Sequence, residues 1–145
     1  MRLFSKIAFL AAIVSALACH DSVAPELPTT YILNRVNGQS VPFVSPIPEN
    51  PTIVSGGLIL QSNGRATLIQ RRLQWGTDVT TTTNYTYTIT GTDIAFTYYC
   101  SPDLVCLELP TVPPPRGTIA GGRITLDMNP GGNGLTYEFQ FSAPD

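Results

Sequence analysis

Few residues of this chain could perform catalysis, and none of them stands in a recognisable catalytic pattern. His20 is the only histidine among the 145 residues, so a serine or cysteine nucleophile would depend on this imidazole as its general base. His20 lies in a short polar segment that contains Pro25 and Pro28, which favours a flexible tether over a fixed site. The sequence therefore predicts neither a Ser/His/Asp nor a Cys/His arrangement.

Paired carboxylates can hydrolyse glycosides without histidine, so the acidic residues need separate attention. Their settings are ordinary: Asp93 belongs to a turn, Asp103 lies in a proline-containing loop, and Glu138 lies on the polar side of an alternating segment. Nothing in their spacing indicates that two of them converge. We therefore expect a protein that is not an enzyme and that uses no cofactor.

The two cysteines in the second half of the chain favour a structural disulfide. Cys100 and Cys106 lie close together in the sequence, and so small a ring would stabilise the fold by roughly 2 kcal/mol, mainly by restricting the unfolded chain. A redox pair would usually have the Cys-x-x-Cys spacing, and a metal site would need further ligands, with Asp103 and Glu108 the nearest. We expect a Cys100–Cys106 disulfide and no bound metal.

The start of the chain has the order of an export signal: basic, then apolar, then small. The apolar run over residues 7–18 is too short to cross a bilayer core, which needs about 20 residues. The run ends at Cys19. We therefore expect residues 1–18 to be removed as a signal peptide and residues 19–30 to form a flexible tether.

The segment Ser15–Cys19, with the sequence SALAC, resembles the lipobox of bacterial lipoproteins. The resemblance implies that Cys19 carries acyl chains, palmitate among them, which anchor the protein stably to a membrane of the bacterial cell envelope. Ordinary cleavage after Ala18 is the alternative, but it would leave an odd number of thiols in an oxidising compartment. His20 then follows the lipid, where an aspartate would favour inner-membrane retention, so the outer membrane is the expected location.

The charge of the mature chain argues against nucleic acid as a partner. After residue 18 the chain has six arginines, no lysine and ten carboxylates, which gives a net charge of −4. No basic patch is available to attract phosphate backbones. A lysine nucleophile is excluded as well, because Lys6 leaves with the signal peptide.

Alternation with period two predicts an all-β domain over residues 31–145. It is cleanest over residues 80–99, where Tyr85 and Tyr87 share one face, a turn follows at Gly91, and Phe96 and Tyr98 resume the pattern. These residues predict a hairpin with an aromatic inner face.

Further turns divide the rest of the domain into hairpins between neighbouring strands. Asn37-Gly38, Asn63-Gly64 and Gly121-Gly122 can adopt the positive φ angles that tight hairpin turns require. About eight strands result, in an antiparallel meander that would remove its open edges by closing into a small barrel. A β-sandwich with the same hairpins is the alternative.

These turns and alternations resemble the lipocalin-like domain of small bacterial lipoproteins. The segments that carry the resemblance are Tyr31–Gln39 (YILNRVNGQ), Gly57–Gly64 (GLILQSNG), Tyr87–Phe96 (YTITGTDIAF) and Leu135–Phe139 (LTYEF). The resemblance implies a barrel that can hold a small molecule in its interior.

Arg71 is the most suggestive interior candidate. In one regular strand over residues 66–75, Arg71 would share a face with Leu73 and Trp75, and a charge on an apolar face needs a partner. Arg71 could meet a ligand's acidic group inside the barrel, pair with an internal carboxylate, or be sent to solvent with Arg72 by a bulge. The predicted ligand pocket consists of Arg71, Trp75, Tyr85, Tyr87, Phe96 and Tyr98.

Two functions follow from this sequence. The first is a non-enzymatic envelope lipoprotein whose barrel binds a small apolar or amphipathic molecule. The second is a structural or interaction module with a filled core, whose exposed loops, such as Thr111–Arg116, meet another envelope protein. A barrel of about eight strands can either fill with side chains or hold one ligand, so the sequence leaves both open.

Overall fold

The computed structural model describes residues 29–47, 50–100, 111–132 and 134–143, and this part of the chain forms β-strands joined by turns. β5 is much the longest strand, and β2 is only two residues long. The strands are β1 (Thr29–Val36), β2 (Gln39–Ser40), β3 (Thr52–Leu60), β4 (Arg65–Gln74), β5 (Thr77–Thr90), β6 (Asp93–Tyr98), β7 (Arg116–Ala120), β8 (Arg123–Asp127) and β9 (Thr136–Ser142).

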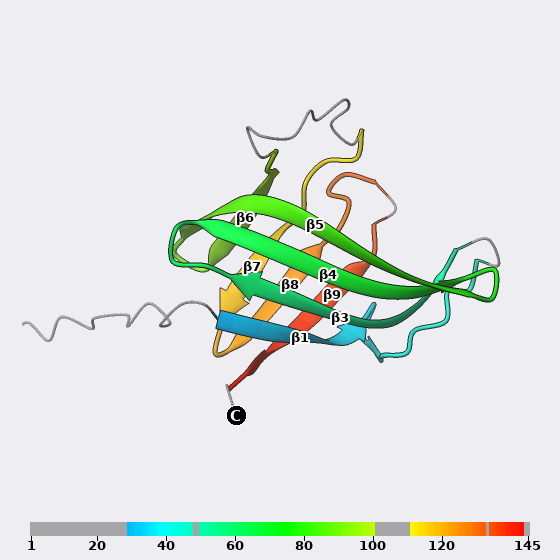
Figure 1. Ribbon diagram of the computed structural model, residues 1–145. Helices are drawn as coiled ribbons and strands as arrows, with labels where there is room; N and C mark the ends of the chain where they lie inside the picture. The colour runs from blue at the N-terminus through cyan, green and yellow to red at the C-terminus, as the bar shows by residue number, and fades with distance from the viewer. Residues whose placement is uncertain (1–28, 48–49, 101–110, 133, 144–145) are drawn as a thin grey trace, which may run out of the picture.

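All strands except β2 form a closed antiparallel barrel (Figure 1). From β3 to β9 each strand pairs with the next one along the chain, and β1 pairs with β3 on one side and β9 on the other. The pairing of β1 with β9, which aligns Tyr31 with Phe141, closes the sheet. The predicted meander and its closure are therefore confirmed, and the sandwich is wrong. β1 begins at Thr29, two residues before the expected start of the domain.

Two of the three predicted pairs form two-residue turns, whereas at Asn63-Gly64 only Gly64 has positive φ and the loop from Gln61 to Arg65 is longer. Asn37 and Gly38 both have positive φ, as do Gly121 and Gly122, so each pair forms the two-residue turn that suits the twist of a hairpin. Asn37 also holds β9 in place, because its side-chain oxygen accepts a hydrogen bond from the Thr136 backbone N–H at 2.8 Å.

One tight turn was missed by the sequence analysis. Trp75 and Gly76 have φ angles of 50° and 79° and connect β4 directly to β5, which therefore begins at Thr77 and not at Thr80. β5 pairs with β4 over its first part, and within the described residues β6 joins β5 only from Tyr85 onward. The β4–β5 hairpin consequently projects beyond the barrel at one end, seen on the right in Figure 1.

The core side chains inside the barrel are exposed by 4% or less. On β4 the inward positions are the even-numbered ones, because Ala66 and Leu68 are buried whereas Ile69 and Leu73 are 37% and 42% exposed. Phe43 closes the hairpin end of the barrel by exchanging two backbone hydrogen bonds with Ile53. The core consists of Tyr31, Leu33, Val36, Phe43, Ile53, Leu58, Leu60, Ala66, Leu68, Tyr85, Ile94, Phe96, Ile124, Leu126, Tyr137 and Phe139.

The adjacent pair Leu68 and Ile69 tests which face of β4 is inward. Leu68→Ala should lower the free energy of unfolding by about 2 to 5 kcal/mol, because it leaves a cavity in a filled core. Ile69→Ala, the matched control on the outer face, should cost less than about 1 kcal/mol. Urea unfolding of the two variants measures both changes, and a larger loss for Ile69→Ala would contradict the assigned face.

Candidate functional site

Four of the predicted pocket residues meet in one aromatic cluster. The ring of Tyr85 lies 5.2 Å from that of Tyr98 and 5.5 Å from that of Phe96, and the ring of Tyr87 lies 6.3 Å from that of Phe96. The register of β5 with β6 aligns Tyr85 with Tyr98 and Tyr87 with Phe96, as the alternation predicted. The Tyr87 hydroxyl donates a hydrogen bond to the Gln61 carbonyl oxygen at 3.0 Å.

The rings of this cluster pack against one another. Tyr85 and Phe96 are only 4% and 3% exposed, so little of either ring can be reached by a molecule the size of water. Burial raises the pKa of Tyr85 to about 12, the nearby Tyr98 adds to the rise, and a hydrogen bond with Thr83 opposes it. At neutral pH the Tyr85 hydroxyl is therefore protonated and is not poised for proton transfer.

The other two predicted pocket residues lie outside the barrel, so their expected interior position is wrong. Trp75 is 86% exposed at the tip of the β4–β5 hairpin. Arg71 lies on the outer face of β4, where its Nε donates to both carboxylate oxygens of Asp78, at 3.0 and 2.8 Å, and its Nη2 donates to one of them. These hydrogen bonds lower the pKa of the exposed Asp78 carboxyl.

The physical reason for this correction is the phase of β4, that is, which of its alternating residues point into the barrel. The register of β4 with β5 is regular through both arginines, so no bulge turns them to the same side. Ala66 and Leu68 fill the core, and strict alternation from them carries Gln70 and Arg72 inward and Arg71 outward. Arg72 thus occupies the interior position that the sequence analysis gave to Arg71.

Gln70 and Arg72 face Tyr137 of β9 at the hairpin end of the barrel. Gln70 Nε2 donates a hydrogen bond to the Tyr137 hydroxyl oxygen at 2.9 Å, which joins β4 to β9 across the interior. Burial raises the pKa of Tyr137, while the charge of Arg72 and the hydrogen bond with Gln70 act against the rise. The Nε of Arg72 is buried and has no hydrogen-bond partner.

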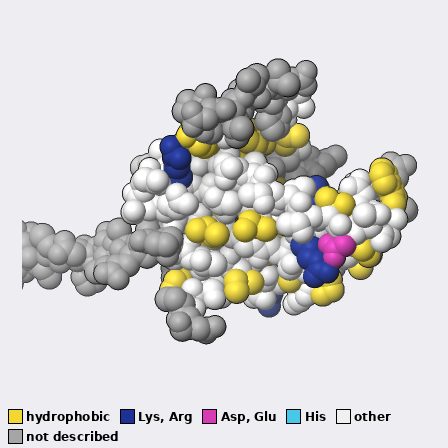
Figure 2. Space-filling model, viewed as in Figure 1, with side chains coloured by type: hydrophobic (Ala, Val, Ile, Leu, Met, Phe, Trp, Pro, Cys, Tyr) yellow, Lys and Arg dark blue, Asp and Glu magenta, His cyan; other side chains and the backbone are white. Residues whose placement is uncertain are grey.

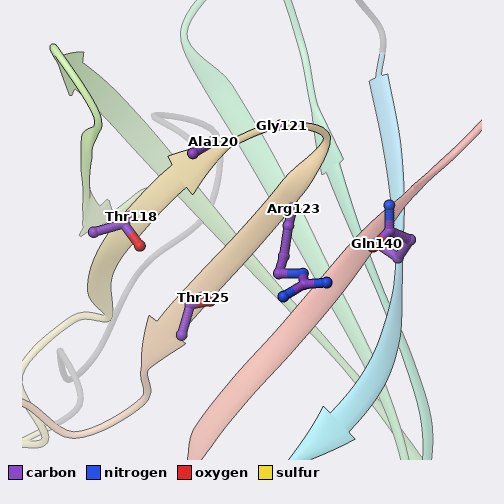
Figure 3. Close-up of a pocket in the computed structure, with 6 residues that line it drawn as sticks. All are labelled: Thr118, Ala120, Gly121, Arg123, Thr125 and Gln140. Atoms are coloured by element: carbon purple, nitrogen blue, oxygen red, sulfur yellow. The ribbon is translucent and has the colours of Figure 1, made fainter.

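A shallow depression of about 310 Å³ lies on the outer face of β7, β8 and β9. Figure 3 shows Arg123 between Thr125 and Gln140, with Thr118 on the neighbouring strand. Arg123 and Gln140 are cross-strand partners in the register of β8 with β9. The depression offers one guanidinium, two hydroxyls and an amide, which can form hydrogen bonds but do not combine a nucleophile with a general base.

The remaining predicted sites fall largely outside the described residues. Cys19, Cys106 and the loop with Asp103 and Glu108 lie there, so the lipid anchor and the identity of the disulfide partner stay predictions. Cys100 is described, and it is disulfide-bonded. In the part of the chain that the structure covers, no group of three His, Cys, Asp or Glu side chains could hold a metal ion. No helix within that part is long and apolar enough to span a membrane.

Comparisons with models of protein families, with curated proteins and with solved structures found no match.

The raised pKa of Tyr85 predicts a loss of stability in alkali. Above pH 10 the tyrosine ionises in the unfolded chain but stays protonated in the fold until about pH 12, so the free energy of unfolding falls as the pH rises through this window. Tyr85→Phe should reduce the loss between pH 8 and pH 11 by about 1 kcal/mol. Urea unfolding of both proteins at the two pH values measures the difference, and an unchanged loss in Tyr85→Phe would contradict the burial of this hydroxyl.

Proposed function

We propose that this protein is a non-enzymatic, lipid-anchored component of the bacterial cell envelope whose lipocalin-like barrel presents the β4–β5 hairpin to another envelope protein. The exposed Trp75 at the hairpin tip is the observation that carries the proposal. In this proposal the barrel is a rigid scaffold, and Cys19 carries the anchor.

The filled interior supports a scaffold. The inward side chains of the core contact one another and are exposed by 4% or less, and the four aromatic residues predicted to line a pocket pack together instead. A ligand deep in the barrel would have to displace this core, and interiors packed in this way resist small changes in volume.

The conformation of Trp75 supports a role for its side chain beyond the fold. A bulky residue at φ 50° is strained, and the same kind of turn uses Asn37 at the equivalent position of the β1–β2 hairpin. The indole is 86% exposed, so it gains little from packing that would offset the strain. Tryptophan is also among the residues that contribute most to protein interfaces.

Other apolar side chains lie at the same end of the molecule. Leu73 is 42% exposed beside the tip, and Val44 and Ile47, at 70% and 55%, belong to the segment that leads into β3. The start of β3 pairs with the end of β4, since Thr52 aligns with Leu73. Figure 2 shows hydrophobic side chains on the surface where this hairpin projects.

The position of the chain end favours a protein over the bilayer as the partner of the tip. β1 begins at Thr29, which aligns with Leu60 at the end of the barrel away from the hairpin. A lipid on Cys19 would hold the protein from that end. The flexible tether would then leave the hairpin, at the opposite end, free to reach other proteins of the envelope.

A second function has a separate observation in its favour. The unpartnered, buried Nε of Arg72 supports binding of a small amphipathic molecule with an acidic group at the hairpin end of the barrel, not deep inside it.

Trp75→Asn should separate stability from binding. The free energy of unfolding should rise by about 1 kcal/mol, because asparagine tolerates positive φ better than tryptophan does. Attachment of the variant to its partner in intact cells should be lost. Ile32→Asn, at a position that is 52% exposed on β1, is the matched control and should keep the partner.

Photo-cross-linking in cells measures the attachment. A photoreactive residue at position 75 should form one recurrent adduct with an envelope protein, which the same residue at position 32 does not form. That adduct protein should co-purify with Ile32→Asn and not with Trp75→Asn. Equal co-purification with both variants would remove the proposed role of the tip.

The anchor is tested independently by Cys19→Ala. This variant should move from the membrane fraction to the soluble fraction and should incorporate no labelled acyl chain, because one cysteine carries the whole attachment. Cys106→Ala is the control and should remain in the membrane fraction. Membrane partition of Cys19→Ala equal to that of the wild type would contradict the lipid anchor.

A further inference from the structure

Arg72 is the one described residue whose buried side-chain nitrogen has no hydrogen-bond partner in the structure. A guanidinium is a cation with five donors and no acceptor, so burying one of its N–H groups without a partner is unfavourable. The acidic side chain nearest in register, Asp78 on β5, is held by Arg71 on the outer face. The interior arginine is thus left without the carboxylate that its neighbour has.

The Tyr137 hydroxyl supplies a second donor beside Arg72. Its oxygen accepts the hydrogen bond from Gln70 Nε2, so its own hydrogen is free to be donated to another group. Burial raises the pKa of Tyr137, which keeps that hydrogen in place at neutral pH. Arg72 follows Gln70 by two residues on the same face of β4, which places its side chain beside the one that holds this hydroxyl.

Arg72 connects these donors to solvent, because the Tyr137 side chain is itself only 3% exposed. Arg72 is half-buried, whereas its cross-strand neighbour Ile53 is fully buried, so the arginine reaches from the core toward solvent. Val41, Met128 and Leu135 are partly buried hydrophobic residues that pack against the core. They lie at the same end, because Met128 and Leu135 flank the loop from β8 to β9 and Val41 follows β2.

We propose that Arg72 and Tyr137 form a binding site for the carboxylate of a small amphipathic molecule at the hairpin end of the barrel. The guanidinium N–H groups and the tyrosine O–H donate to the carboxylate oxygens, which gives the buried Nε its missing acceptor. The apolar part of the ligand lies on Val41, Met128 and Leu135. This site does not depend on Trp75.

Decanoate, with decanol as the uncharged comparison, is a suitable probe for isothermal titration against the lipid-free domain. Decanoate should bind one to one, and Arg72→Gln should weaken it at least about tenfold through loss of the charged donors. Arg71→Gln, the matched control on the outer face, should bind as the wild type does. Decanol should bind the wild type no more tightly than it binds the Arg72→Gln variant.

Two further measurements keep the test decisive if Arg72→Gln is poorly folded. Tyr137→Phe keeps the ring and should weaken the binding of decanoate several-fold. In the wild type, the Nε–Hε NMR resonance of Arg72 should shift when decanoate is added but not when decanol is added. Trp75→Asn should bind decanoate normally, so failure of this site and failure of the hairpin interface are distinguishable. Absent binding, an unshifted Arg72 resonance, or equal affinity in Arg72→Gln would overturn the proposal.

Discussion

The pairing of β1 with β9 is the constraint on which the rest of the structure depends. It converts a meander of eight strands into a closed barrel, so every barrel strand acquires one face toward a shared interior and one toward solvent. The irregularity in β1 between Leu33 and Arg35 preserves this division into an inner and an outer face. Asn34 and Arg35 are both exposed there, and the extra residue returns Val36 to the interior, where it is completely buried.

Because the barrel is closed, the alternation of each strand also decides which polar side chains face the interior and which face solvent. A shift by one residue exchanges the two faces, so the phase of β4 decides which of two adjacent arginines is exposed and paired. Arg71 meets Asp78 outside the barrel, whereas Arg72 extends inward beside Tyr137 with a buried donor left unpaired. The Arg72 site follows from that one alternation.

Turns and clean alternation were predictable from the sequence, because both are local. Asn37-Gly38 and Gly121-Gly122 are residue types that tolerate the positive φ of tight turns, and the alternation of Tyr85, Tyr87 and Phe96 is uninterrupted. These signals were sufficient for the all-β meander and its aromatic cluster. The closure of the barrel followed from the need to remove open edges.

The phase of β4 and the turn at Trp75 could not be predicted in the same way. Leu68 and Ile69 are adjacent and both apolar, so the apolar pattern fits either face, and only packing against the other strands selects Leu68. Tryptophan gives no turn signal, and its place in a tight turn is set by the pairing of Gln74 with Thr77. The contact of Gln70 with Tyr137 joins residues far apart in the chain and has no local signature.

The buried core and the exposed hairpin are the two features on which the proposed function depends. Side chains fill the barrel, while Trp75 holds a strained, solvent-exposed position that the fold does not need. In the proposed function, the barrel provides the stability and its hairpin end provides the recognition. The filled interior is the central claim, because a cavity would return the aromatic cluster to the role of a ligand pocket.

Titration of the lipid-free domain with a neutral, apolar fluorescent probe tests this claim most directly. A neutral probe avoids the carboxylate site at Arg72, and a parallel titration of Trp75→Asn shows whether any signal comes from the exposed hairpin tip and not from the interior. With a filled interior, the probe emission and the unfolding midpoint should both stay unchanged at every accessible probe concentration. Binding at one probe per barrel, accompanied by a higher unfolding midpoint, would contradict the filled core.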